Sequence, residues 1–322
     1  MAPVIPPEVA FDIQNIHTAL TYPVPDQEAL VNTIGRRENQ QLVVIARTYK
    51  ATYNVDLPSE LDRRIIGSVG NLLAAVCMHK VLAEVHYLHR AGKSCRKYEA
   101  LRKKDTALQV FCEILVGRSP EQLRELQEAF KAVHQTDLLE HVHSFCEDEI
   151  TKAFFTEIVK DKEEKPFDDA AAEVQKLHGL LQANDLNGLL HYVASLTTEQ
   201  LGLVVRSYNS QYKDAHVVST IEEKVAPANK HSHDHLHLLL FAVMQAADPA
   251  RHVALLFEES MSGLGTNEDQ LSRLVAIHRG KFMDKVKTAY HGDYSRTLAD
   301  RVRGDTSGLY SNLICHLINQ TI

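Results

Sequence analysis

The residues with the clearest chemical potential lie in two turns near the end of the chain. Residues 261–266 form a turn signal that contains Gly263 and Gly265, and residues 304–308 form a second one around Asp305. Glycines allow backbone conformations that turn several carbonyl oxygens towards one point, and Asp305 adds a carboxylate. Neutral carbonyl oxygens with a single carboxylate suit calcium better than magnesium or zinc. We expect such a site to be weak until an outside anion, such as a phosphate group, completes it.

Helix signals flank the first turn. Asp248, followed by Pro249, predicts where the preceding helix begins, because aspartate caps helices and proline suits their first turn. Thr266, with Asp269 three residues later, predicts the beginning of the next helix. The candidate cation-binding turn therefore connects two helices.

A histidine-rich segment spans residues 231–237. Closely spaced histidines bind zinc or copper, but the segment is one residue short of the HxHxDH pattern of metallo-hydrolases and has no strand scaffold. We interpret it as a loop that senses pH or holds a second metal, with a plain solvated loop as the alternative. The candidate residues are His231, His233, His235 and His237.

No pattern predicts catalysis. Cys146 lies near His141 and His143, but their spacing is helical and matches no nucleophile motif. Ser262 is not part of a GxSxG turn, and no strand precedes it. We therefore predict that the protein is not an enzyme.

A basic segment stands out against an acidic chain. Residues 90–104 carry seven basic side chains and one acidic one, whereas the whole chain has a net charge of −7. Near an anionic leaflet each such cation gains about 1 kcal/mol, reduced by salt. The segment is a candidate for calcium-independent lipid contact, and a solvated loop and helix face is the alternative. The candidate residues are Lys93, Arg96, Lys97, Arg102, Lys103 and Lys104.

Composition narrows the class of protein. With 44% hydrophobic and 24% charged residues the chain is globular, and its acidic balance argues against a nucleic-acid partner. Five cysteines without CxxC spacing are typical of a reducing compartment. The first residues do not resemble a signal peptide, and the apolar runs are too short to span a bilayer. We predict a cytoplasmic protein.

The elements that position these residues are predicted to be helices arranged in repeats. Apolar residues recur at helical spacing, as at Leu309, Leu313 and Leu317, so the fold class is all-α. Four similar segments have their aromatic residues 81, 78 and 82 positions apart, and an apolar helix follows each. The four aromatic residues are Tyr49, Phe130, Tyr208 and Tyr290.

The spacing predicts four helical units of similar length. A charged stretch before Pro166 reads as a solvated linker between the second and third units. The predicted organisation is a short N-terminal segment at 1–9, repeats at 10–79 and 80–160, a linker at 161–166, and repeats at 167–246 and 247–322.

With these features the chain resembles the annexin family. That family has four repeats of five helices, with a Gly-x-Gly-Thr loop between the first two helices of a repeat. Its acidic residue lies forty positions beyond the second glycine, which here is Asp305, and residues 117–123 resemble the loop before its third helix. The resemblance implies four repeats in a curved, right-handed superhelical disc. It also implies a non-enzymatic protein that binds phospholipid in a calcium-dependent manner.

The resemblance further implies the ligands and the partner. The carbonyls of Met261, Gly263 and Gly265 and the side chain of Asp305 would hold Ca²⁺, leaving one coordination position for a lipid phosphate. We therefore expect a peripheral protein on the cytosolic face of plasma or vesicle membranes, bound to phosphatidylserine-like anionic lipids. Self-association on the membrane is a further expectation.

The first three repeats depart from the family pattern. The first loop, residues 21–26, has no glycine, and the acidic slot of that repeat holds Arg64. The slot holds Phe145 in the second repeat and Lys224 in the third, so we predict that these three repeats bind no calcium in the family's manner. The alternative function is a helical scaffold for protein partners. Its membrane contact would be largely independent of calcium, through the basic or histidine-rich segment.

Overall fold

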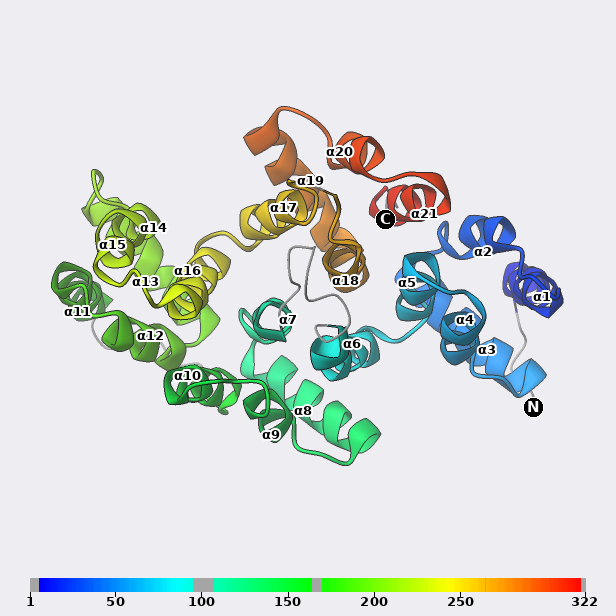
Figure 1. Cartoon of the computed structure of the whole chain (residues 1–322), viewed down its shortest axis with the longest axis horizontal. Coiled ribbons are helices and arrows are strands. Elements are labelled where there is room, and N and C mark those ends of the chain that lie inside the picture. Colours follow the sequence, from blue (N-terminus) through cyan, green and yellow to red (C-terminus); the bar gives the residue numbers. More distant parts are fainter. Residues whose placement is uncertain (1–5, 95–106, 164–169, 264, 320–322) are drawn as a thin grey trace. The chain divides into compact units, whose positions relative to one another are not determined.

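The computed structural model describes residues 6–94, 107–163, 170–263 and 265–319, without the side chains of residues 92–94. Within these ranges every regular element is a helix, which confirms the predicted all-α class (Figure 1). No helix in the described part of the chain combines the length and the apolar character that crossing a bilayer requires.

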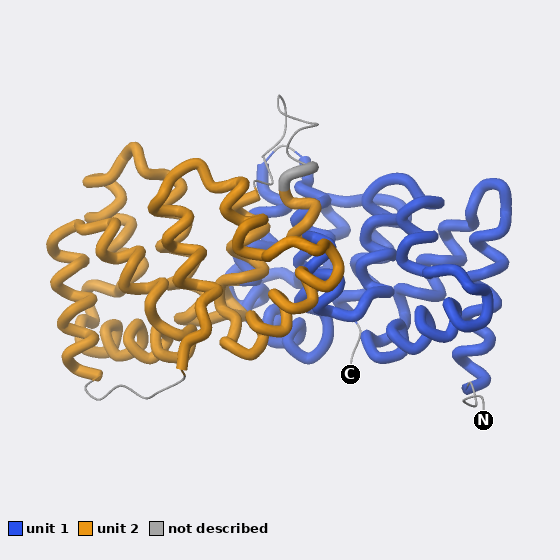
Figure 2. The backbone as a smooth tube through the Cα atoms, turned by 90° about the horizontal axis from the view of Figure 1, so that it is seen from below, with its two compact units in different colours: residues 1–87, 98–105, 253–322 blue, residues 88–97, 106–252 orange. Residues whose placement is uncertain are grey.

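The chain divides into two compact units, coloured separately in Figure 2. Of the described residues, 6–87 and 253–319 belong to unit 1, and 88–94 and 107–252 belong to unit 2. The boundaries of the units fall within two helices, α6 (Lys80–Ser94) and α17 (Pro249–Ser260).

Unit 1 joins the first and last stretches of the chain in one core. Helix α5 packs against α18 and α21, and α2 also contacts α21, as Figure 1 shows. Besides its parts of α6 and α17, the described part of unit 1 contains α1 (Pro7–Thr21), α2 (Gln27–Ile34), α3 (Asn39–Tyr53), α4 (Leu57–Arg64), α5 (Ser68–Val76), α18 (Glu268–His278), α19 (Lys281–Tyr294), α20 (Leu298–Asp305) and α21 (Gly308–Ile318).

Unit 2 is built around the long apolar helix α16, which packs against α12 and α13. Capping boxes define where α8 and α13 begin, through Ser119 with Gln122 and Thr197 with Gln200. Besides its parts of α6 and α17, the described part of unit 2 contains α7 (Ala107–Leu115), α8 (Pro120–His134), α9 (Leu138–His143), α10 (Glu149–Val159), α11 (Ala170–Ala183), α12 (Leu186–Ser195), α13 (Thr198–Gln211), α14 (Val217–Thr220), the π-helix η1 (Ile221–Val225), α15 (Ala226–Ala228) and α16 (His233–Ala247).

The four aromatic residues of the predicted repeats are all buried, with exposed fractions of 0–2%. Two of them hydrogen-bond to a histidine about thirty residues earlier. Tyr49 Oη lies 3.1 Å from His17 Nδ1, and Tyr208 Oη lies 3.2 Å from His178 Nδ1. Tyr290 also hydrogen-bonds to a residue about thirty positions earlier, but its hydroxyl donates to a carboxylate, that of Glu258.

A second ring, one helical turn further along, completes this arrangement. His17 stacks on Tyr53 with ring centroids 3.8 Å apart, and His178 stacks on Tyr212 at 4.4 Å. His89 stacks on His134 at 3.9 Å beside the buried Phe130. The recurrence of one side-chain arrangement supports the four-repeat division, whose boundaries stay a prediction.

Three local expectations were wrong. Helix α18 begins one residue later than the Thr266 signal predicts, because Asn267 is the cap and its side chain accepts the Gln270 N–H at 3.1 Å. The histidine-rich segment is not only a loop, because α16 already begins at His233. The charged linker is not fully solvated either. Lys162 donates to the backbone oxygens of Ala194 and Leu196, and burial lowers its pKa to about 8.

Candidate metal centre

The first predicted turn connects α17 to α18. Gly263 and Gly265 have φ values of 90° and 81°, a region that side-chain-bearing residues rarely adopt. The N–H of Asn267 donates to the carbonyl of Ser260 at 2.7 Å and closes the turn. The Met261 side chain, 1% exposed, anchors the turn in the core of unit 1. The two glycines therefore shape a closed turn that exposes backbone, as the sequence predicts.

Asp305, the last residue of α20, lies against this turn. The Thr266 hydroxyl donates to the Asp305 carboxylate, and it also lies 3.1 Å from the Asp305 carbonyl oxygen. Thr266 is thus a bridge between the two turns, which explains why it does not cap α18. The structure brings the predicted carboxylate to the predicted carbonyl turn, although 39 residues separate Thr266 from Asp305.

A guanidinium that the sequence reasoning missed lies between these groups. Arg301 Nη1 is 3.1 Å from Asp305 Oδ1, and Nη2 donates to the Met261 carbonyl. Its Nε lies 3.2 Å and 3.1 Å from the two carboxylate oxygens of Glu258. The Arg301 side chain is only 13% exposed. Two of the four predicted calcium ligands are therefore already bound to one internal cation.

Glu258 holds the far side of this guanidinium. It also accepts from Tyr290 and forms an ion pair with Arg296 at 3.1 Å. Burial acts to raise the pKa of Glu258, but the hydrogen bonds from Tyr290 and Arg301 outweigh it and lower the pKa. Glu258 is therefore a carboxylate at neutral pH, and Arg301 lies between two negative groups.

The donors at this centre fit calcium. Met261 and Asp305 present a carbonyl and a carboxylate oxygen to the same cationic group, so both are within reach of one positive charge. Among the described residues, no three His, Cys, Asp or Glu side chains form a metal-binding group. Backbone carbonyls would have to supply most of the ligands, which suits calcium rather than zinc.

The corresponding turn of the first repeat, between α1 and α2, is built differently. Arg64, in the predicted acidic slot at the end of α4, donates to the carbonyl of Leu20 at 2.9 Å and also to that of Tyr22. The Asp26 N–H closes the turn on the Ala19 carbonyl at 3.0 Å. A side-chain cation thus occupies the position that a carboxylate holds in the last repeat.

The other two acidic slots also lack a carboxylate. Phe145 packs against Phe111 and His141, with ring centroids 6.0 Å and 5.2 Å away. Lys224 is exposed on the π-helix η1. Neither side chain could supply an oxygen to a cation.

The basic segment cannot be placed. Five of its candidate residues, Arg96, Lys97, Arg102, Lys103 and Lys104, lie outside the described residues. Lys93 falls within α6, but its side chain lies outside the description as well. Calcium-independent lipid contact by this segment stays a prediction.

The four candidate histidines do not meet at one point. His231 and His233 are exposed, whereas His235 Nε2 lies within hydrogen-bond distance of Asp148 Oδ1, at 3.0 Å. Burial lowers the pKa of His237. Burial also acts on Asp148, but the hydrogen bonds from Thr151 and His235 outweigh it and lower the pKa of that carboxyl to about 2. In the described chain, these histidines therefore belong to no common metal-binding group.

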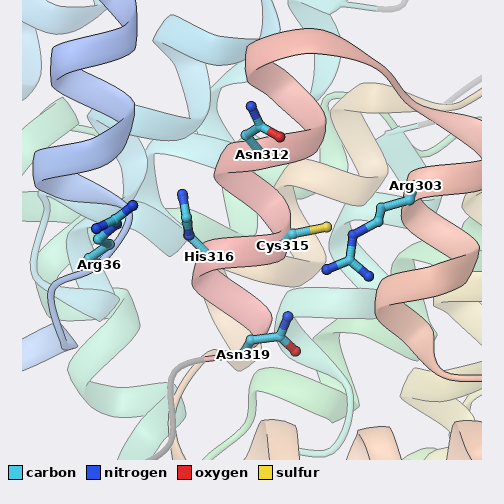
Figure 3. Close-up of a pocket in the computed structure, with 6 residues that line it drawn as sticks. All are labelled: Arg36, Arg303, Asn312, Cys315, His316 and Asn319. Atoms are coloured by element: carbon cyan, nitrogen blue, oxygen red, sulfur yellow. The ribbon is translucent and has the colours of Figure 1, made fainter.

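A cavity in unit 1 is the other candidate site. Its volume is about 490 Å³, and Figure 3 shows that Cys315 and His316 point to opposite sides of α21. Burial raises the pKa of the Cys315 thiol, so it is not a ready nucleophile. The lining residues are Arg36, Arg303, Asn312, Cys315, His316 and Asn319. The cavity does not bring a nucleophile to a base.

The cysteine near the histidine pair in unit 2 is equally unsuited to nucleophilic catalysis. Cys146 donates to the Val142 carbonyl at 3.3 Å, and burial raises its pKa to about 11. His143 Nε2 lies 3.2 Å from the Lys152 carbonyl and 3.1 Å from the Thr156 hydroxyl. His143 is therefore bound to other partners rather than to the thiol.

Known proteins resemble this chain along nearly its whole length. The sequence model of the annexin family matches residues 96–156 and 251–317. Annexin C1 of Cryptococcus neoformans is 23% identical over 97% of this chain and 66% of its own length. Annexin D3 of Arabidopsis thaliana is 23% identical over 98% of this chain and 97% of its own length.

Solved structures agree on the fold. A mutant of annexin A8 matches with a TM-score of 0.81 and 20% identity, covering 99% of this chain and 96% of that one. Chicken annexin V also matches with a TM-score of 0.81, at 18% identity over 99% and 98% of the two chains. The family model, the relatives and the fold all support the annexin family for this chain. Annexins are generally non-enzymatic, calcium-dependent phospholipid-binding proteins.

Proposed function

We propose that this chain binds anionic phospholipid through one calcium site, formed by the turns α17–α18 and α20–α21. The carbonyls of Met261, Gly263 and Gly265 and the carboxylate of Asp305 would hold the ion. Bound there, calcium supplies positive charge and a coordination position for a lipid phosphate. The observation that carries the proposal is the Arg301 guanidinium, which already bonds to Met261 and Asp305.

Arg301 sets the condition for this binding. Its Nη2 must give up the Met261 carbonyl before that oxygen becomes a ligand, and its Nη1 must release Asp305. Glu258 stays available to hold the guanidinium, because it bonds to Nε on the side away from Asp305. Arg301 thus neutralises the site without calcium and has a partner to retain it afterwards.

The acidic chain gives calcium a second role. With a net charge of −7, the protein as a whole is repelled by an anionic leaflet. A calcium ion shared between Asp305 and a lipid phosphate offsets that repulsion locally, and the affinities for calcium and lipid are then reciprocally linked. Phosphatidylserine-like lipids on the cytosolic leaflet are the proposed partner.

Cosedimentation with phosphatidylserine vesicles tests the proposal. The full chain and Asp305→Ala would be compared in calcium and in chelator. We expect calcium-dependent binding that the substitution abolishes at low calcium. Binding with no calcium dependence in either protein would contradict the proposal and favour the scaffold alternative.

A further inference from the structure

The two most exposed large apolar side chains of the described chain lie on two neighbouring loops of the first repeat. Ile66, in the turn between α4 and α5, is 94% exposed, and Val24, between α1 and α2, is 79% exposed. Tyr22, on the same loop as Val24, is 53% exposed. Side chains of this kind are normally withdrawn from water, so their concentration on two linked loops requires a reason.

The two loops are joined by Arg64. Its guanidinium, two residues before Ile66, donates to the carbonyls of Leu20 and Tyr22. Ile65 is 1% exposed and anchors the α4–α5 turn in the core, so Ile66 must point away from it. Pro23 and Pro25 flank Val24 and fix the backbone on both sides of it. The exposed side chains are therefore held in place, not left on a loose loop.

These loops are adjacent to the candidate calcium turn. The Ser68 hydroxyl, two residues beyond Ile66, donates to the Glu268 carboxylate, three residues beyond Gly265. Both residues lie at the N-terminal ends of helices α5 and α18, which pack together in unit 1. A surface that meets the calcium turn therefore also meets the turn that carries Ile66.

We propose that Tyr22, Val24 and Ile66 insert into the interfacial region of a lipid bilayer, on a surface that is formed without calcium. The proposal rests on the proposed function for the orientation of unit 1 towards the membrane. Backbone carbonyls enter a region of low polarity only when they are hydrogen-bonded, and Arg64 supplies that bond for Leu20 and Tyr22. Tyrosine is also enriched at the membrane interface.

The dimensions of the surface favour a bilayer over a protein partner. Stable protein interfaces use about 20–30 residues on each side, arranged around a packed core. Three apolar side chains on two loop ends fall far below that size. They match a shallow insertion, in which each side chain enters the lipid separately while a second attraction holds the protein at the surface.

A single tryptophan reports the insertion directly, because the chain contains none. Ile66→Trp would be mixed with vesicles of equimolar phosphatidylserine and phosphatidylcholine in calcium. We expect a blue-shifted emission that brominated acyl chains quench. The matched control is Phe11→Trp, at a residue that is 63% exposed near the opposite end of α1 from Tyr22. Its emission should not shift. An unshifted, unquenched Ile66→Trp on pelleted vesicles would overturn the proposal.

Ile66→Asp measures the contribution to binding. At saturating calcium we expect about a tenfold or larger loss of vesicle affinity, in line with removing one large apolar side chain from a buried place. Calcium binding measured calorimetrically without vesicles should stay unchanged in Ile66→Asp. Because Ile66 is almost fully exposed, circular dichroism should confirm an intact fold. Unchanged vesicle affinity in this variant would also refute the insertion.

Asp305→Ala separates this inference from the function on which it rests. If Asp305→Ala keeps full calcium-dependent binding while Ile66→Trp is quenched, the calcium site is wrong and the insertion stands. If Asp305→Ala loses binding while Ile66→Asp keeps it, the calcium site stands and the insertion is wrong. Native-like vesicle binding by both Asp305→Ala and Ile66→Asp would contradict both.

Discussion

The turns of the first and last repeats in unit 1 satisfy their backbone carbonyls in two different ways. Each turn leaves backbone carbonyls without a helical partner, and in each an arginine from a following helix donates to them. Arg64 binds the carbonyls of Leu20 and Tyr22, whereas Arg301 binds that of Met261. The difference lies in the acidic slot, which holds Arg64 itself in the first repeat and Asp305 in the last.

This difference decides whether the internal cation is exchangeable. No carboxylate faces Arg64 in the contacts that hold it, so a calcium ion that replaced it would gain only neutral oxygens. Arg301 lies between Asp305 and Glu258, so a calcium ion could take one carboxylate while the other retains the guanidinium. The carbonyls of the first turn are therefore permanently bonded to their arginine, whereas those of the last turn are bonded to theirs only until calcium arrives.

Asp305→Ala should have the largest effect, because it removes the group that makes the last turn exchangeable. We expect the calcium needed for half-maximal vesicle binding to rise by more than the roughly 10- to 100-fold that losing a mere outer-shell partner costs. Vesicle cosedimentation over a calcium series measures it. The matched control is Asp284→Ala, an exposed carboxylate paired with Lys287 on α19. An equal shift in both variants would show that only surface charge matters.

Arg64→Gln tests the permanence of the first turn. The variant loses charge-assisted bonds to two carbonyls, so we expect the free energy of unfolding to fall by about 1.5–3 kcal/mol. Urea denaturation measures this loss. Calcium binding measured calorimetrically without vesicles should stay unchanged, because the first turn binds no ion. Tighter or additional calcium binding in the variant would mean that Arg64 blocks a calcium site, and the two turns would then differ only in degree.

The sequence predicted the parts of this comparison that follow from periodicity. The repeat spacing placed Tyr49 and Tyr290 at equivalent positions of two repeats, and the family pattern placed Arg64 and Asp305 in equivalent slots. The structure supports these placements, since both tyrosines are buried and both slot residues contact their repeat's first turn. Such positions are predictable because one residue's role repeats along the chain.

The parts that escaped prediction depend on contacts between distant residues. Arg301 is four residues before Asp305, which a helix pattern could suggest, but its partner Glu258 is 43 residues earlier and follows no motif. Thr266 resembled a helix cap because no local sequence pattern indicates its tertiary hydrogen bond to Asp305. His235 resembled a free ligand because Asp148 lies 87 residues away in sequence. In both cases the sequence suggested a local role for a residue whose actual role is a tertiary contact.

Arg301→Gln tests whether the last turn is conditional. Glutamine cannot supply the positive charge, so Asp305 and the Met261 carbonyl become easier for calcium to take. We expect about a tenfold lower calcium requirement, equivalent to about 1.4 kcal/mol, and a larger rise in Tm on adding calcium than in the native chain. Arg303→Gln, on the exposed side of α20, is the control. A higher calcium requirement would instead make Arg301 a residue that positions Asp305.

We expect the smallest effect from alanine substitutions at one glycine in the first repeat and one in the last. Gly265 and Gly67 have φ values of 81° and 93°, and among the described residues nothing lies within 4 Å of a Cβ added at either position. Alanine therefore introduces backbone strain of about 1–3 kcal/mol without a steric clash. We expect Gly265→Ala to raise the calcium requirement about fivefold, since its carbonyl must turn to the ion. Gly67→Ala should lower Tm because of a similar backbone strain, and it should leave the calcium requirement unchanged. If both substitutions shifted the calcium requirement equally, the two turns would be coupled through Ser68 and Glu268, and the first repeat would take part in calcium binding after all.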